Sequence, residues 1–269
     1  MGEVNVVSGY KGLSLDGKRA LVFGGTSGLG KSIALGLAEA GADVVPVSRR
    51  AEEVRKTAAE VRRLGRQALE LRADVTRRED IQRVIDEILK GMGRIDILVN
   101  SAGTTRRVPS LEMTDEEWDC IMDVNLKGSW HTCQMVGRVM KEQRYGRIIN
   151  IASLGAFRSL HEVTAYCASK GGVVMLTRCL AAEWAKYNIA VNAVAPGYFE
   201  TPLNRHIINE PGRKGAILAN TPLRRFGSLV EIQGAAVFLA SDSASFVTGE
   251  ILCVDGGFMA QGVGEGAQA

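Results

Sequence analysis

Strand-like and helix-like segments alternate along nearly the whole chain, from Arg19 to Val254. The candidate strands are short, rich in β-branched residues and bounded by Gly, Asp or Asn. They span residues 20–24, 43–48, 68–73, 95–100, 147–152, 189–194 and 250–254. This alternation predicts parallel strand pairing, right-handed crossovers and helices on both faces of one sheet.

The segments between the strands are amphipathic, as helices that pack on a sheet must be. Their apolar stripes are Ile33, Ala34, Leu37 and Ala38 in the first, and Val54, Ala58, Val61 and Leu64 in the second. Thr114 stands three residues before Glu117 in capping-box form, so we expect a helix to begin just after Thr114. No proline- or serine-rich linker divides the 269 residues. We therefore predict an α/β fold: a single doubly wound domain over residues 1–269 with a seven-stranded parallel sheet.

Residues 197–222 break the alternation. Pro196, Pro202, Pro211 and Pro222 punctuate this stretch, which has little periodicity. A long irregular insertion in a compact domain is usually a lid, a binding loop or disorder. This one follows the carboxyl end of a predicted strand, where open α/β sheets bind ligands. We interpret it as a substrate lid carrying short helices.

Composition excludes several classes of function. A formal charge of +3 is too small to predict nucleic-acid binding. No segment approaches the ~20 apolar residues of a membrane span. Five cysteines without C-x-x-C spacing and three scattered histidines indicate neither a disulfide framework nor a metal site. We expect a cytoplasmic enzyme without a metal ion.

A glycine-rich loop joins the first strand to the first helix. It reads Gly24-Gly25-Thr26-Ser27-Gly28-Leu29-Gly30, with G-x-x-x-G-x-G spacing. Glycines permit a tight turn and close backbone approach to a pyrophosphate, which would lie at the helix amino terminus. The alternative is a turn that only packs a helix on a strand, but the loop's position favours phosphate binding.

The end of the second strand distinguishes the two nicotinamide dinucleotides. An acid there would bind the ribose 2′-hydroxyl of NAD. Here Val47 is followed by Ser48, Arg49 and Arg50. An arginine can bind a 2′-phosphate through two charge-assisted hydrogen bonds, although these could also be surface arginines. We predict NADP in preference to NAD.

Tyr166 and Lys170 are four residues apart in a helical stretch, so they lie on one helix face. A free phenol has a pKa of about 10, and a nearby cation would favour its ionised form. The pair could then serve as a general acid and base. Ser153 follows an apolar strand and could hold a substrate oxygen. Alone, the spacing also fits a core aromatic residue beside a solvated amine.

Taken together, these motifs resemble the short-chain dehydrogenase/reductase family, in its single-domain Rossmann-type branch. The match covers roughly residues 15–258. The matching positions are Gly24, Gly28, Gly30, Asp74, Val75, Asn100, Ser101, Ala102, Gly103, Asn125, Ser153, Tyr166, Lys170, Pro196, Gly197 and Thr201.

The resemblance implies a catalytic tetrad of Asn125, Ser153, Tyr166 and Lys170. Tyr166 would exchange a proton with the substrate, Ser153 would orient its oxygen, and Lys170 would bind the nicotinamide ribose and favour the tyrosinate. Asn125 would hold a water that links Lys170 to solvent. The implied cofactor-binding residues are Gly24, Thr26, Ser27, Gly28, Leu29, Gly30, Ser48, Arg49, Arg50, Asp74, Val75, Asn100, Ala102, Gly103, Tyr166, Lys170, Pro196, Gly197 and Thr201.

Two positions depart from the family's usual pattern. Phe23 stands where a threonine is common, and Ser101 where the family favours a second asparagine. We expect altered packing and retained activity.

The segments at residues 100–107, 195–201 and 254–258 resemble most those of the gluconate 5-dehydrogenase and 2-deoxy-gluconate 3-dehydrogenase group of the family. Arg106, Arg107 or Arg158 could bind a sugar-acid carboxylate, or could be solvent-facing arginines. The runner-up is a 3-oxoacyl-thioester (acyl-carrier-protein) reductase, with Arg138 and Arg178 in a carrier-protein patch. A third interpretation is an NADP-binding regulatory protein with a vestigial site, against which the complete tetrad argues. The resemblance also implies a homotetramer, with paired helices around 126–141 and 163–186 and a second interface near 250–258.

Overall fold

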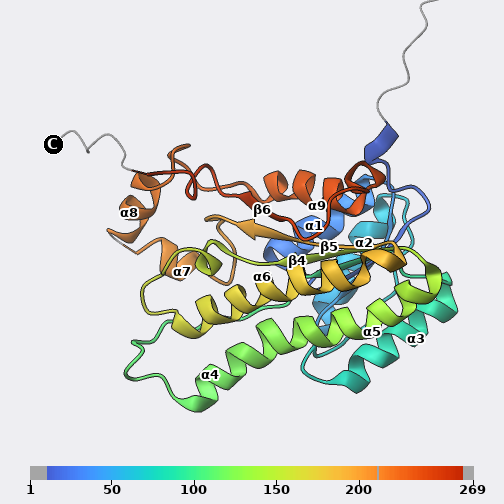
Figure 1. Ribbon diagram of the computed structural model, residues 1–269, viewed down its shortest axis with the longest axis horizontal. Coiled ribbons are helices and arrows are strands. Elements are labelled where there is room, and N and C mark those ends of the chain that lie inside the picture. The colour runs from blue at the N-terminus through green and yellow to red at the C-terminus, as the bar shows by residue number, and fades with distance from the viewer. Residues whose placement is uncertain (1–10, 211, 263–269) are drawn as a thin grey trace, which may run out of the picture.

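Six parallel strands form one sheet in the computed structural model, which describes residues 11–210 and 212–262 (Figure 1). The strand order is β2-β1-β3-β4-β5-β6. The strands are β1 (Arg19–Phe23), β2 (Asp43–Val47), β3 (Ile97–Asn100), β4 (Gly146–Ile151), β5 (Ile189–Pro196) and β6 (Ile251–Val254). The chain runs from β1 outward to β2 and then crosses back to β3, so the order reverses between β1 and β3. This is the doubly wound arrangement predicted from the sequence, with a topological switch point at that reversal.

Helices cover both faces of the sheet, as predicted (Figure 1). One core holds α1 (Gly28–Glu39), α2 (Ala51–Arg63) and α9 (Gln233–Ala240) against the sheet. The other face carries α3 (Arg78–Met92), α5 (Gly128–Gln143) and α6 (Thr164–Trp184). Successive strand residues alternate between the two cores: Val22 packs in the first and Phe23 in the second. The strands are therefore apolar on both sides, which explains their continuous apolar runs.

The predicted strand at residues 68–73 is wrong. This segment makes a single bridge, between Ser48 and Arg72, beside the outer edge of β2. The segment bonds to β2 only near its two ends: the Val44 N–H donates to the Gln67 carbonyl at 3.0 Å, and the Ala73 N–H donates to the Ser48 carbonyl at 3.2 Å. Arg62 of α2 binds the stretch between them, donating to the Ala68 carbonyl at 2.9 Å and pairing with Glu70 at 2.7 Å. The sheet therefore has six strands within the described residues instead of seven.

The second predicted helix stripe needs one correction. Val54, Ala58 and Val61 are buried, but Leu64 is 41% exposed. The helix ends at Arg63, and Leu64 is its C-cap residue, so it has left the helical period.

The long helical run in front of the sheet begins as predicted, at a capping box on Thr114. Its hydroxyl accepts from the Glu117 N–H, and the Glu117 carboxylate accepts from the Thr114 N–H. The run comprises α4 (Asp115–Met122), a π-helical turn at Asp123–Lys127, and α5. Such π-turns are often found at functional sites.

Residues 197–222 contain two short helices, α7 (Arg205–Ile208) and α8 (Arg213–Ala219). Both lie apart from the helix layers, at one end of the molecule (Figure 1). Pro211, together with residues 1–10 and 263–269, falls outside the described part of the chain.

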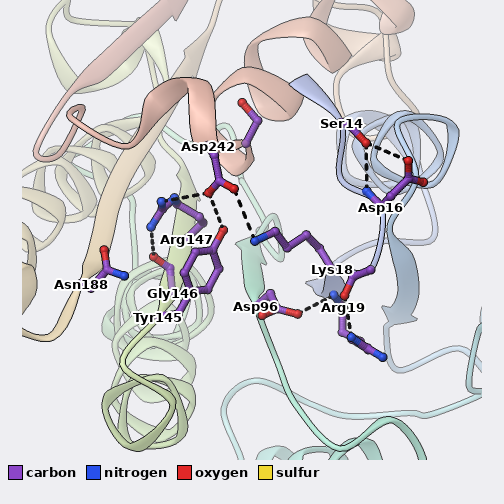
Figure 2. Close-up of polar contacts among 12 residues, drawn as sticks. Ser14, Asp16, Lys18, Arg19, Asp96, Tyr145, Gly146, Arg147, Asn188 and Asp242 are labelled. Atoms are coloured by element: carbon purple, nitrogen blue, oxygen red, sulfur yellow. Dashed lines mark hydrogen bonds and ion pairs between the residues drawn. The ribbon is translucent and has the colours of Figure 1, made fainter. Parts of the chain in front are cut away.

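A polar cluster joins the sheet's amino end to the turn at Asp242 (Figure 2). The Asp242 carboxylate forms ion pairs with Lys18 at 3.7 Å and Arg147 at 3.4 Å, and it accepts a hydrogen bond from the Tyr145 hydroxyl at 3.1 Å. Lys18 also stands 4.0 Å from the centre of the Tyr145 ring. These contacts connect the segments leading into β1 and β4. They leave the carboxyl ends of the strands free to form a site.

Candidate active site

A cleft of about 550 Å³ opens at the carboxyl ends of the strands, beside the switch point. Most of the residues predicted to bind cofactor or substrate line it. These are Gly24, Thr26, Ser27, Gly28, Leu29, Gly30, Ser48, Arg49, Arg50, Asp74, Val75, Ala102, Gly103, Ser153, Tyr166, Lys170, Pro196, Gly197 and Thr201. Strand ends far apart in the sequence therefore supply one continuous wall.

The glycine loop has a geometry that side chains would obstruct. Gly24 has a φ of +74°, and a Cβ there would lie 2.5 Å from the Ala102 nitrogen. A Cβ on Gly30 would overlap the Gly24 carbonyl. Ser27 is the N-cap of α1, yet among the described residues it makes no side-chain hydrogen bond to the first turn. The helix terminus therefore presents N–H groups to the cleft, which fits a pyrophosphate.

Both departures from the family pattern have a structural role in this loop. Phe23 is 1% exposed and packs in the core that holds α3 and α5. Ser101 donates its N–H to the Phe23 carbonyl at 2.9 Å, and its hydroxyl lies 2.8 Å from where a Gly30 Cβ would be. The small side chain therefore fills the space beside Gly30 that a larger amide would have to share.

The end of β2 forms a basic corner of the cleft. The Ser48 hydroxyl accepts from the Arg50 N–H at 3.3 Å, which turns the chain after Val47. Arg49 is 74% exposed, and its guanidinium lies 3.8 Å from the Asp74 carboxylate. The other Asp74 oxygen accepts from the Thr76 N–H and hydroxyl. The end of β2 itself carries no acid that could bind a ribose hydroxyl. Arg49 is instead placed to bind a phosphate.

Ser153 and Tyr166 meet in the cleft. Ser153 follows β4 by two residues and accepts the Gly155 N–H at 3.1 Å, which starts a short turn at Leu154–Ala156. Tyr166 lies in the first turn of α6. Burial raises the pKa of the Tyr166 phenol, and the adjacent Ser153 hydroxyl partly opposes that rise. A substrate oxygen between the two hydroxyls would contact both.

Lys170 is buried one turn after Tyr166. Its ammonium donates to the Ile151 carbonyl at 2.6 Å and lies 5.7 Å from the centre of the Tyr166 ring. Burial lowers the pKa of Lys170 to about 8. Desolvation is the main influence on the pKa of Tyr166 and raises it, so the expected lowering by Lys170 stays a prediction.

Asn125 sits in the π-turn, fully buried. Its side chain accepts the Thr104 N–H at 2.8 Å and donates to the Thr104 carbonyl and the Ser169 hydroxyl. The amide thus holds the loop after β3 in place beside Gly103. Its side chain does not line the cleft, and its role in holding a water stays a prediction.

Asn100 also differs from its prediction as a cofactor-binding residue. Its side chain points into the core, where it donates to Asn150 at 2.9 Å and accepts from Thr132 at 2.7 Å. It does not line the cleft. The amide joins β3 to β4 and α5, which fixes the strand end that carries Ser101 and Ala102.

The three arginines predicted to bind a substrate carboxylate lie outside the cleft lining. Arg106 pairs with Glu117 at 3.0 Å. Arg107 pairs with two glutamates, Glu162 and Glu210. Arg158 is exposed and donates to the Gln261 carbonyl at 3.3 Å. Long-range acidic partners thus hold the first two guanidinium groups, and carboxylate binding by any of the three stays a prediction.

Sequence reasoning missed several cleft residues, among them Cys120, Val124, Leu203 and Asn204. Asn204 had a possible signal, since a polar side chain three residues after Thr201 can cap a turn. Its carboxamide accepts from both the N–H and the hydroxyl of Thr201. The apolar residues carry no comparable signal, because nothing local separates a cleft wall from a core face.

Two absences hold for the described residues. None of their helices is long and apolar enough to cross a membrane. No group of three or more His, Cys, Asp or Glu side chains among them could hold a metal ion.

Comparison with known proteins gives matches over nearly the whole chain. A family model described as Enoyl-(Acyl carrier protein) reductase matches residues 24–259. A 2-dehydro-3-deoxy-D-gluconate 5-dehydrogenase of Pseudoalteromonas atlantica is 44% identical over 247 residues, 91% of this chain and 97% of that protein. A 3-oxoacyl-[acyl-carrier-protein] reductase of Thermotoga maritima is 39% identical, over 92% of this chain and 100% of that protein.

The fold matches a solved structure equally well. The crystal structure of a gluconate 5-dehydrogenase from Burkholderia cenocepacia, in complex with NADP and tartrate, has a TM-score of 0.91 and 40% identity, and the match covers 94% of this chain and 99% of that one. The sequence match, the strand order and the cleft agree: the chain belongs to the short-chain dehydrogenase/reductase family.

Proposed function

We propose that this oxidoreductase uses NADP to interconvert a secondary alcohol and a ketone on a sugar acid of the gluconate type. The observation that carries the proposal is the meeting of Ser153, Tyr166 and Lys170 in the same cleft as the glycine loop. One cleft thus combines a proton-transfer group with a dinucleotide cradle. Relatives acting on gluconate-type substrates, at 44% identity for the P. atlantica protein, support the substrate class.

The proposed chemistry divides between cofactor and protein. NADP would supply or accept the hydride when bound. Tyr166 would give a proton to the ketone oxygen or take one from the alcohol, and Ser153 would hold that oxygen by a hydrogen bond. Since burial raises the pKa of Tyr166, the phenol carries its proton at neutral pH and is ready to act as an acid. Lys170 would supply a positive charge beneath the site.

The preference for NADP rests on Arg49. Its exposed guanidinium stands at the cleft corner with a single long contact to Asp74. The B. cenocepacia relative was crystallised with NADP. Arg49→Ala should raise the Kd of NADPH about tenfold or more, in line with a charged hydrogen bond of about 1.5–3 kcal/mol, and change NADH binding little. Equal loss for both cofactors would refute the assigned preference.

Arg213 is a further candidate for the substrate carboxylate, and like Arg106, Arg107 and Arg158 it stands outside the cleft lining. It begins α8, is half-buried, and forms no ion pair with any residue that the structure describes. Burial raises the pKa of Tyr198, and the charge of Arg213 opposes this rise. Arg213→Gln should raise KM for a sugar acid and spare an uncharged polyol.

A 3-oxoacyl-thioester reductase is the second candidate, favoured by the 39% identity to the T. maritima reductase. Arg138 and Arg178 are both exposed, on α5 and α6, and could contact an acidic carrier protein. Acetoacetyl thioester turnover faster than that of every sugar acid would favour this alternative.

One experiment tests the function. Absorbance at 340 nm is followed with gluconate, 2-keto-gluconate, simple sugars and an acetoacetyl thioester, each with both cofactors. Tyr166→Phe should abolish turnover of the accepted substrate while NADPH still binds, measured by fluorescence titration. Normal turnover in that variant would exclude the proposed proton transfer. No turnover by the wild type would leave a regulatory NADP-binding protein as the better interpretation.

We further infer a cytoplasmic homotetramer in which residues 197–222 act as a substrate lid. Apolar side chains on α4, α5 and α6 support the assembly: Trp118, Trp130 and Met175 are 37%, 36% and 55% exposed. Light scattering would measure the mass, and a monomer at micromolar concentration would contradict the tetramer. The five free cysteines fit a reducing compartment.

A further inference from the structure

Three separate segments of the chain meet at Arg107. Its Nε lies 2.6 Å from the Glu162 carboxylate, and its Nη1 lies 2.6 Å from the Glu210 carboxylate. Arg107 belongs to the loop between β3 and α4, Glu162 to the turn that leads into α6, and Glu210 to the connection between α7 and α8. The three side chains are 31%, 25% and 42% exposed, so water screens the pairs only in part.

Two of these segments are already fixed to each other. The Val108 N–H donates to the Glu162 carbonyl at 2.8 Å, and the hydroxyls of Ser110 and Thr164 are 2.6 Å apart. Glu162 has a φ of +62°, a left-handed conformation that non-glycine residues adopt only where surrounding contacts hold them. The loop that carries Arg107 and the turn that carries Glu162 are therefore fixed to each other. Glu162 lies four residues before Tyr166.

The third segment, which carries Glu210, is attached to these two through Arg107. Among the described residues of 197–222, Glu210 forms the ion pair that reaches outside the segment, whereas Glu200 pairs with Arg205 inside it. Figure 1 shows α7 and α8 at the end of the molecule where α6 begins. The same segment supplies Thr201, Leu203 and Asn204 to the cleft wall. The placement of Glu210 therefore bears on the shape of the site.

We propose that Arg107 is a positioning residue that latches the α7–α8 segment onto the turn leading to Tyr166. The guanidinium neutralises the carboxylates of Glu162 and Glu210, which would otherwise be close together with no positive charge between them. Without it, Glu162 and Glu210 would repel, and the segment would move away from the cleft. The latch acts on substrate capture and leaves the reacting atoms untouched, so its loss should appear in KM.

The test compares Arg107→Gln with Arg205→Gln, which removes an ion pair of similar length, 2.7 Å, inside the same segment. Arg107→Gln should raise KM for the substrate about fivefold, which corresponds to about 1 kcal/mol, with kcat within about twofold. It should also speed proteolytic cleavage between α7 and α8. Arg205→Gln should change neither.

Two further measurements separate a latch from a general loss of stability. Adding Glu210→Gln to Arg107→Gln removes the repulsion between the two carboxylates. It should lower KM part of the way back to the wild-type value. High salt should raise the wild-type KM toward that of Arg107→Gln, because screening weakens partly exposed pairs. Unchanged KM and proteolysis in Arg107→Gln, or equal effects in Arg205→Gln, would overturn the latch.

The kinetic readout rests on the proposed function, but proteolysis does not. If no substrate is turned over, the proposed function fails while cleavage rates still decide the latch. If turnover is normal and cleavage is unchanged in Arg107→Gln, the latch fails and the proposed function stands.

Discussion

Lys170 offers a direct test of the electrostatics of the site, through the stability of the protein. Burial lowers its pKa from the ordinary value of 10.5 to about 8. The unfolded chain therefore keeps the lysine proton over a pH range in which the folded protein has released it. Stability rises with pH wherever the unfolded state binds more protons, so this group adds stability as pH climbs from about 8 to 10.5.

The size of the effect follows from the same pKa. A difference of about 2.5 pH units, at about 1.4 kcal/mol per unit, gives about 3 kcal/mol across the whole range. By pH 10 the gain over pH 7 should be about 2–3 kcal/mol. Lys170→Met lacks the group. Its stability at pH 7 also reflects the unmet Ile151 carbonyl, a loss of about 1–3 kcal/mol, so only the pH dependence is diagnostic.

The assay is urea unfolding without cofactor at pH 7, 8, 9 and 10. Stability of the wild type minus that of Lys170→Met should grow by about 2–3 kcal/mol across the series. The subtraction cancels the alkaline titrations that the two proteins share. Lys90→Met removes an exposed lysine and should show no such trend. If the difference in stability between the wild type and Lys170→Met does not change with pH, the lowered pKa of Lys170 would be refuted.

Three further outcomes are expected. Gly30→Ala should weaken NADPH binding more than tenfold, since its Cβ would meet the Gly24 carbonyl; Gly91→Ala in α3, whose Cβ would lie 3.4 Å from the Leu69 side chain in ordinary contact, should bind normally by titration. Thr114→Ala should lower the unfolding free energy by about 1 kcal/mol through loss of the cap, and an unchanged urea midpoint would contradict that. For alcohol oxidation, kcat/KM should rise with pH above neutrality, because burial raises the pKa of the Tyr166 phenol that must lose its proton; a flat profile would argue against Tyr166 as the base.

Local patterns predicted most of the fold. Strands β2 to β5 follow from apolar runs buried on both faces, β1 from the run before the glycine loop, and the partly exposed β6 from a short apolar run. Their bounds differ from those predicted by at most two residues at either end. The start of α4 follows from Thr114 and Glu117. The segment at 68–73 has a strand's pattern but bonds to β2 only near its two ends. No local pattern distinguishes such a segment from a fully paired strand.

The site divides in the same way. The glycine loop and the Tyr166–Lys170 spacing are local, and the structure places them in one cleft. Arg107 pairs with Glu162 and Glu210, which are 55 and 103 residues away, so these ion pairs could not be predicted from local spacing. Asn100 gave a misleading signal, because its amide bonds to Asn150, 50 residues on, and faces the core instead of the cleft.

The π-turn at Asp123–Lys127 has a consequence for changes in chain length. A π-turn holds one more residue than an α-turn, and each residue of an α-helix rotates its side chain by about 100°. Deleting one residue there would straighten the run into ordinary helix and rotate α4 relative to α5. The apolar stripe of α5 would then no longer face the sheet while Cys120 and Val124 faced the cleft. Relatives should therefore tolerate substitutions in this stretch far better than single-residue gaps, and library design should hold its length fixed.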